Sequence, residues 1–181
     1  MNANSGRTAL IDAPPPYLPV TAEAASAGLD LVGVSVAARC AYYQLVCQLP
    51  AVLDPDSGQI IVSAGRVQAV MMPSALGHRV RTELDRTDAD SGPIVSHPKS
   101  RSWTFITTAD LQIDELPDAT LLWVNNVVVL ASGIRIGLPT PTAIGAAPCR
   151  EWQTPPSSPQ RPTTTTVLDA VRACVKGGEH R

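Results

Sequence analysis

The residues that could carry out chemistry are few and scattered in this sequence. Its histidines are His78, His97 and His180, and a serine adjoins a histidine only at Ser96. A serine nucleophile needs a sharp strand-to-helix turn that exposes its hydroxyl, and no such elbow surrounds Ser96. We therefore interpret the histidines as exposed or capping residues, and we assign no catalytic residue.

Carboxylates occur in pairs, but each pair lies in a polar turn sequence. The pairs are Asp54/Asp56, Asp88/Asp90 and Asp114/Glu115. Two-metal phosphoryl transfer needs carboxylates fixed on rigid elements, whereas Asp in such turns normally serves turn geometry. Phosphate-binding motifs of the GxxxxGK[ST] and GxGxxG types are also missing from the sequence. We therefore expect no cofactor.

The four cysteines do not suggest a metal site. They are Cys40, Cys47, Cys149 and Cys174, and no CxxC pair occurs among them. Structural zinc sites normally show closely spaced ligand pairs. We therefore predict buried, unligated cysteines and no bound metal.

One cluster of cations is a candidate binding surface. Arg79 and Arg81 fall in a predicted helix, and Lys99 and Arg101 fall in the hairpin that follows it. If these elements converge, the cations and the neighbouring Trp103 form a nucleic-acid-binding surface, in which aromatic rings stack on bases. The alternative is that the cations form a solvated face and that the tryptophans, Trp103, Trp123 and Trp152, belong to the core.

Composition limits the function classes. The chain has 181 residues, 14 Lys and Arg against 16 Asp and Glu, 44% hydrophobic residues and only 17% charged residues. A net charge of −2 does not indicate a strongly basic nucleic-acid binder, although a local basic patch remains compatible with it. No apolar run approaches a membrane span, and the first residues lack the order of a signal peptide, so we expect a cytoplasmic protein without membrane contact.

Hydrophobic periodicity and turn residues predict an alternating order of helices and strands. The expected helices are 21–27, 37–49, 73–84 and 164–175. The expected strands are 59–62 and 67–72 as one hairpin, 93–96 and 101–107 as a second hairpin, then 121–124, 127–130 and 134–138.

This order predicts an α+β fold with a mixed or antiparallel sheet built from hairpins and flanked by helices. The 17 prolines divide the chain further. We expect a proline-rich tail at 1–19, one α+β domain at 20–154 and a proline-rich linker at 155–163. A C-terminal helix at 164–176 would dock on the domain.

The stretch from about Gln59 to Cys174 resembles actinobacterial proteins of the bifunctional DNA primase/polymerase type, in the archaeo-eukaryotic primase superfamily. The resemblance rests on the order of short segments rather than on one specific motif. These segments are VMMPSAL at 70–76, GPIV at 92–95, RSWTFI at 101–106, GIRIGLPTPT at 133–142, then Gly145 and Trp152. It implies a primase/polymerase-like fold.

Departures from the family are informative. The resemblance implies acidic metal ligands on the strand before the helix, yet that strand reads VQAVMMP at 67–73. It also implies a histidine near Trp103 or Thr104 and an acid within 126–132, and neither is present. Without carboxylates no group is available to hold Mg²⁺ against a triphosphate.

The sequence therefore favours a catalytically degenerate primase/polymerase-like domain that acts by binding. Its partner would be single-stranded or duplex DNA, or a replication or regulatory protein; the sequence does not specify the oligomeric state. Two alternatives remain open: an active nucleotidyltransferase with a displaced acidic site, and an unrelated α+β protein-interaction domain.

Overall fold

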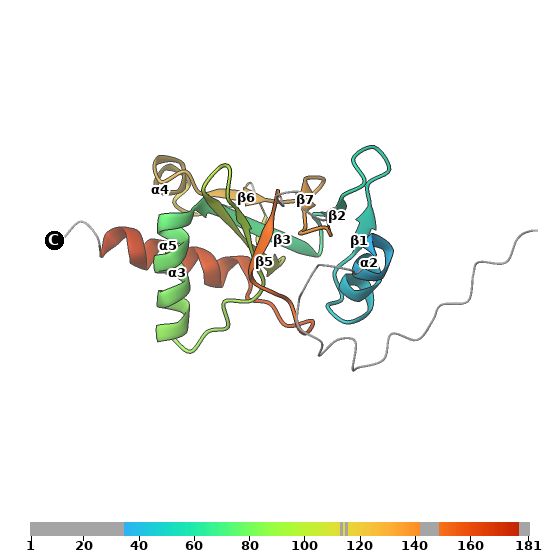
Figure 1. Ribbon diagram of the computed structural model, residues 1–181. Coiled ribbons are helices and arrows are strands. Elements are labelled where there is room, and N and C mark those ends of the chain that lie inside the picture. The colour runs from blue at the N-terminus through green and yellow to red at the C-terminus, as the bar shows by residue number, and fades with distance from the viewer. Residues whose placement is uncertain (1–34, 113, 115, 142–148, 178–181) are drawn as a thin grey trace, which may run out of the picture.

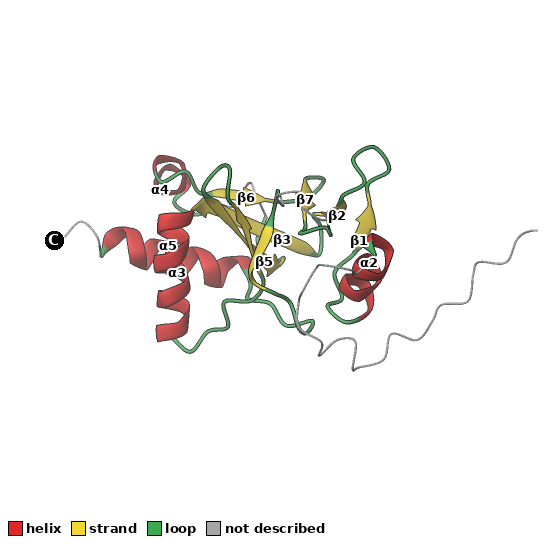
Figure 2. Ribbon diagram, viewed as in Figure 1, coloured by secondary structure: helices red, strands yellow, loops and turns green. Residues whose placement is uncertain are grey.

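The computed structural model describes residues 35–112, 114, 116–141 and 149–177. They form an α+β fold in which helices flank two antiparallel sheets (Figures 1 and 2), so the predicted fold class is confirmed. The predicted tail at 1–19, the predicted helix at 21–27 and His180 lie outside the described residues. Among the described residues, no helix has the length and apolar character needed to cross a membrane.

The strands divide into a five-stranded sheet and a three-stranded sheet. Sheet B has the order β6-β3-β5-β4-β8 and sheet A the order β1-β2-β7. The strands of sheet B are β3 (Val67–Pro73), β4 (Ile94–His97), β5 (Ser102–Thr108), β6 (Val128–Leu130) and β8 (Glu151–Thr154). Those of sheet A are β1 (Ala51–Leu53), β2 (Ile60–Ser63) and β7 (Arg135–Gly137). The helices are α2 (Val36–Leu45), α3 (Ser74–Arg86), α4 (Ala119–Val124) and α5 (Thr164–Lys176).

The connections within sheet B follow a known supersecondary pattern. Successive elements β3-α3-β4-β5-α4-β6 fold so that β3 lies between β5 and β6, antiparallel to both. This is the split β-α-β-β-α-β arrangement. Strand β8 extends the sheet beyond β4.

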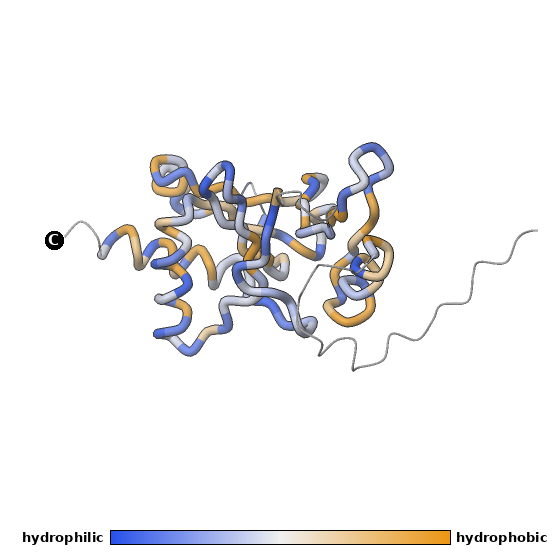
Figure 3. Tube along the Cα trace, viewed as in Figure 1, coloured by the Kyte–Doolittle hydropathy of each residue, from blue (hydrophilic) through white to orange (hydrophobic). Residues whose placement is uncertain are grey.

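Both faces of sheet B are covered. Val70 and Met72 of β3 point to the helix face, where they join a core with α3 and α5. Val67 and Ala69 point to the opposite, inner face, where they pack with residues of α2 and sheet A. Figure 1 shows the resulting layers, with α3 and α5 on one side of sheet B and sheet A with α2 on the other. Hydrophobic segments lie in these central strands and also in the helices around them, α4 included (Figure 3).

The N-terminus of α5 is attached to sheet B by buried hydroxyl groups. Thr164 Oγ1 donates to Gln68 Oε1 at 2.7 Å and lies 2.8 Å from Thr107 Oγ1. Thr163 caps the helix by accepting from the backbone N–H of Thr166 at 3.1 Å. Each buried polar group in this network therefore has a partner.

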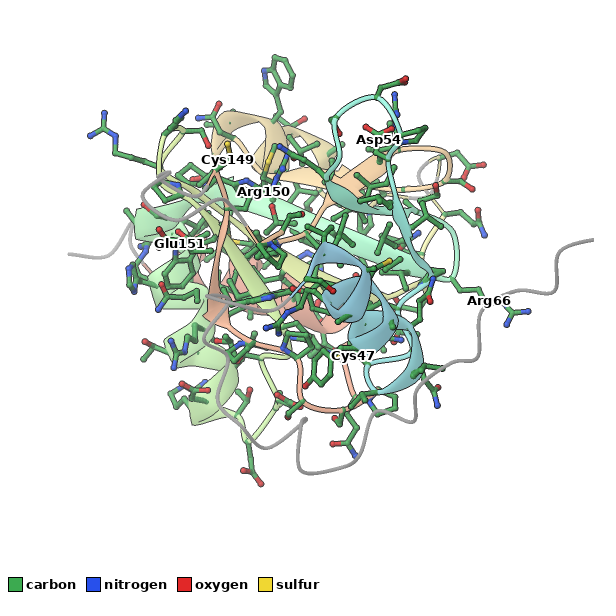
Figure 4. The ribbon with its side chains drawn as sticks, turned by 45° about the vertical axis from the view of Figure 1, so that its right-hand side comes forward. Cys47, Asp54, Arg66, Cys149, Arg150 and Glu151 are labelled. Carbon is green, nitrogen blue, oxygen red and sulfur yellow. The ribbon has the colours of Figure 1, made fainter. Side chains whose placement is uncertain are left out.

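The proline-rich segment before α5 lies against α2. Tyr42 Oη donates to the carbonyl of Pro156 at 3.0 Å, and Arg161 Nη1 donates to the carbonyl of Cys47 at 2.8 Å. Figure 4 labels Cys47 at the end of this helix. These contacts fix the path of 155–163 across the molecule.

The predicted hairpin at 59–72 is wrong. Strand β2 pairs with β1 and β7, whereas β3 pairs with β5 and β6. The turn at Ala64–Arg66 therefore carries the chain from one sheet to the other. The second predicted hairpin is correct, because β4 pairs with β5 in register from Ile94↔Phe105 to His97↔Ser102.

The predicted strand at 121–124 is also wrong, because these residues belong to α4. A short apolar run does not distinguish a strand from a helix by periodicity. The helix ends where Asn125 Nδ2 donates to the Leu121 carbonyl at 2.9 Å and Asn126 adopts a positive φ of 54°. Strands β1 and β8 were not predicted, since each follows or precedes prolines that suggest loops.

The cysteine prediction holds for half of the set. Cys40 and Cys47 are buried and free, whereas Cys149 is exposed and Cys174 is half-buried. Burial raises the pKa of the Cys47 thiol to about 11, which keeps it protonated and unreactive at neutral pH.

Replacing Gly77 with alanine should destabilise the fold. Gly77 lies in α3 directly over Trp103, and a Cβ at this position would lie 2.8 Å from Trp103 Cε3. In an open helix the change would gain about 1 kcal/mol from helix propensity. Here we expect a loss of about 1–3 kcal/mol in the free energy of unfolding, measured by urea denaturation, because the buried indole must move. Thr82→Ala on the exposed side of α3 is the control, and a gain in stability for Gly77→Ala would contradict this packing.

Candidate functional site

One end of sheet B is left open on its inner face. At this end, which we call the rim, β3 and β4 finish and β5, β6 and β8 begin. Side chains near the rim become more exposed: Ala69 is buried, Met71 is half-buried, and Val128, which pairs with Met71, is 45% exposed. The cover provided by sheet A therefore stops short of the rim.

His97 and Thr104 are linked on this open part of the sheet. His97 Nε2 lies 2.8 Å from Thr104 Oγ1, across the β4–β5 pair. His97 is half-buried and Thr104 is buried. The sequence-based interpretation of His97 as an exposed or capping residue is therefore wrong: its ring belongs to the inner face of sheet B.

Arg150 lies next to His97. The register between β4 and β8 pairs Ser96 with Glu151, so the next step of this antiparallel pair places Arg150 opposite His97. Side chains directly opposite one another in such a pair have Cβ atoms about 4.5–5.5 Å apart. Burial lowers the pKa of His97, and the nearby guanidinium of Arg150 lowers this pKa further.

The guanidinium of Arg150 spans the two sheets. It donates through Nη1 to Gln59 Oε1 and lies against Gly137 of β7, where an added Cβ would come within 2.6 Å of Arg150 Nε. Its Nε is buried and has no hydrogen-bond partner among the described residues. Arg150 and Gln59, with Leu138, Thr140 and Cys149, also line a pocket of about 180 Å³.

We call Gln59, Met71, His97, Thr104 and Arg150 the rim site. Its polar groups are a guanidinium with an unused donor, an imidazole, a hydroxyl and an amide, which together suit an anion such as a phosphate group. Within the described part of the chain, no group of three or more His, Cys, Asp or Glu side chains is placed to hold a metal ion.

The carboxylates of segments next to the rim site either have partners within the protein or point away from the site. Asp54, in the turn between β1 and β2, accepts from Ser57 Oγ at 2.5 Å and lies 3.5 Å from Arg135 Nη1. The hydrogen bond from Ser57 lowers the pKa of Asp54, and Arg135 lowers it further. Glu151 is exposed and, as the neighbour of Arg150 in β8, points to the other face of the sheet (Figure 4).

The two predicted binding residues of α3, Arg79 and Arg81, lie on different sides of the helix. Arg79 Nη1 donates to the carbonyl of Cys174 at 3.3 Å, so this side chain lies on the α5 side of the helix. Two residues further on, Arg81 points about 200° away around the helix axis. Arg79 and Arg81 therefore do not form one surface.

The predicted residues of the β4–β5 turn lie at the rim. Lys99 and Arg101 are both exposed, and the Arg101 carbonyl accepts from the backbone N–H of Ser74 at 2.9 Å, which fixes the turn beside the start of α3. Together with Arg150, they give this end of sheet B three cations.

Trp103 occupies the core on the helix face of the sheet. It is only 3% exposed, and the ring of His78 covers it at a centroid distance of 4.1 Å. Its ring offers no free face for a base, so its position fits the core interpretation and not the stacking one. Trp152 is half-buried and donates from Nε1 to Tyr43 Oη at 2.8 Å, whereas Trp123 is 83% exposed.

Sequence reasoning missed Arg150 as a site residue. The only signal was its place two residues before Trp152, which puts both side chains on one face if that stretch is a strand. The surrounding prolines suggested a loop instead. Nothing in the sequence indicates that Gly137, far from Arg150 along the chain, provides the space for its guanidinium.

A larger cavity lies at the opposite end of sheet B. It has a volume of about 740 Å³ and is lined by residues of the strand ends and of the loop after β5, including Gln68, Asp110, Asp114 and Val129. No Lys, Arg or His is among its described lining residues. Its carboxylates make it unsuited to phosphate, so the rim site is the better candidate for nucleic acid.

Comparison of the chain with protein-family models, with curated proteins and with solved structures finds no match.

Replacing Arg150 with alanine should raise the pKa of His97. The folded protein holds the His97 proton more weakly than the unfolded chain does, because burial and the Arg150 charge both disfavour the imidazolium. The contribution of His97 to the free energy of unfolding should therefore fall as the pH drops below about 6.5. NMR titration of the His97 ring should show a higher pKa in Arg150→Ala and an unchanged one in Arg66→Ala. An unchanged His97 pKa in Arg150→Ala would show that the Arg150 guanidinium does not lie close to the His97 ring.

Proposed function

We propose that this chain is a primase/polymerase-like domain that has lost catalysis and holds a nucleic-acid phosphate at the rim site. The observation that carries the proposal is the guanidinium of Arg150, which is oriented by Gln59 and Gly137 and whose buried Nε has no hydrogen-bond partner among the described residues. A guanidinium binds phosphate through parallel N–H donors, and a preorganised one loses little entropy on binding.

Surrounding groups support phosphate as the ligand. His97, which lies opposite Arg150 across the β4–β8 pair, adds an imidazole, and its protonation would be favoured by a bound anion. Lys99 and Arg101 lie in the exposed turn at the same end of sheet B. Cations that line one edge can follow a phosphate backbone without reading its sequence.

The composition of β3 supports binding without synthesis. The inner-face residues of this strand are Val67, Ala69 and Met71. In the family that the sequence resembles, acids on this strand hold the divalent ions for nucleotidyl transfer. Apolar side chains at these positions leave the rim site able to bind an anion but not to assemble such a metal pair.

Arg150→Ala should weaken binding of a fluorescein-labelled 12-nucleotide single strand at 50 mM salt. Loss of one charge-assisted contact should lower affinity about 10- to 100-fold and reduce the dependence of log K on log salt by about one unit. Gly137→Ala should also lower affinity, because its new Cβ displaces the guanidinium without removing any charge.

Arg66→Ala is the matched control for Arg150→Ala, since it removes the same charge from an exposed residue that points away from the molecule (Figure 4). Equal losses in Arg66→Ala and Arg150→Ala would indicate that only net charge matters. No binding by the unaltered protein would overturn the proposal.

Primer extension tests the loss of catalysis. A primed template with nucleoside triphosphates and either Mg²⁺ or Mn²⁺ should give no product above the background of a protein-free reaction. Robust synthesis that tracks with the purified protein would favour the alternative of an active enzyme with a displaced acidic site.

A further inference from the structure

Trp123 is exposed to an unusual degree. Its side chain is 83% exposed and that of the next residue, Val124, is 69% exposed, whereas Leu122 is the buried residue of α4. Figure 3 shows α4 as a largely hydrophobic segment at the margin of the molecule. Trp123 and Val124 together form a small apolar patch that no other described residue covers, and such a patch is a candidate contact surface.

Topology places Trp123 at the same end of sheet B as the rim site, on helix α4, which packs through Leu122 on the helix face of the sheet. Helix α4 ends at Val124, and β6 begins four residues later at Val128, whose partner is Met71 of the rim site. From β6 the sheet continues through β3, β5 and β4 to β8, the strand that follows Arg150. Four strand spacings of about 4.8 Å put the two edges roughly 19 Å apart.

Charge along the rim suits a polyanion. Lys99, Arg101 and Arg150 belong to this end of sheet B, and Glu151 is the acid of its strand ends. Asp118 lies at the opposite end of α4 and is bound to Arg172 Nε at 2.8 Å. An exposed aromatic ring and several cations along one end of a sheet are features of surfaces that bind single-stranded nucleic acid, whereas the hydrophobic core of a protein interface is depleted in charge.

We propose that Trp123 stacks on an unpaired base of a single-stranded nucleic acid that runs across the rim from Arg150. This inference rests on the proposed function and adds to it the strandedness of the ligand and a second contact. A duplex would not make this stacking contact, because paired bases do not present a free face to an indole.

The test compares Trp123→Leu, Trp123→Phe and the unaltered protein in binding the labelled 12-nucleotide single strand. Trp123→Leu, which keeps an apolar side chain but removes the ring, should lower affinity about 5- to 150-fold, the range for loss of one base–aromatic stack. Trp123→Phe, which keeps an aromatic ring, should lower affinity less than Trp123→Leu does. Leu45→Ala is the control, because Leu45 is 65% exposed on α2, across the molecule from α4 (Figure 1).

Tryptophan fluorescence gives an independent readout. Binding of the single strand should quench the emission of the unaltered protein, and this quench should be lost in Trp123→Phe, since Trp103 is buried and Trp152 is half-buried. Affinity for the matching duplex should be unchanged by Trp123→Leu.

The outcomes separate this inference from the proposed function. Binding that depends on Arg150 but not on Trp123 would overturn the stacking contact alone. Binding that depends on neither residue, or no binding, would overturn both proposals. A change of oligomeric state in Trp123→Leu, measured by sedimentation, with unchanged affinity for the single strand would assign the Trp123 surface to a protein interface and overturn the inference.

Discussion

The structure depends on the burial of both faces of β3. Val67 and Ala69 on the inner face and Val70 and Met72 on the helix face are nearly excluded from solvent. A strand that is apolar on both sides must lie inside a sheet covered by two layers. Helices α3 and α5 provide one layer, and sheet A with α2 provides the other. The rim site exists because the second layer is shorter than the strand it covers.

Contacts between segments distant in sequence hold that second layer in place. Tyr43 Oη donates to the Pro139 carbonyl at 2.9 Å and accepts from Trp152 Nε1, so one side chain joins α2, the end of β7 and β8. Burial raises the pKa of Tyr43 to about 12, which keeps its hydroxyl protonated as a donor. The same segment that contributes Trp152 contributes Arg150, so the packing of the two layers also positions the candidate ligand-binding group.

Local signals in the sequence predicted much of sheet B and its helices. The periodicity of Leu76, Val80 and Leu84 indicated α3, and all three residues are buried. Turn residues at 98–101 indicated the β4–β5 hairpin. The predictions that were wrong are those that depend on strands distant in sequence. Strand β2 pairs with β7, more than 70 residues away, rather than with its sequence neighbour β3.

The candidate site was predictable only in part, for the same reason. Lys99 and Arg101 were recognised because they are close in sequence and polar. Arg150 acquires its role from Gly137 and Gln59, which reach it through tertiary packing. Two tryptophans differ completely in burial: Trp103 lies buried under α3, whereas Trp123 is exposed near the end of α4. Residue type alone cannot distinguish a core indole from an exposed one.

The most direct test of the account is an NMR titration of the ¹⁵N-labelled chain with the unlabelled 12-nucleotide single strand. If nucleic acid binds at the rim, the largest amide shifts should fall on His97, residues 99–101 of the turn, Thr104, Arg150 and the start of β6. Shifts confined to the acidic cavity around Asp110, or scattered evenly over the surface, would contradict the account.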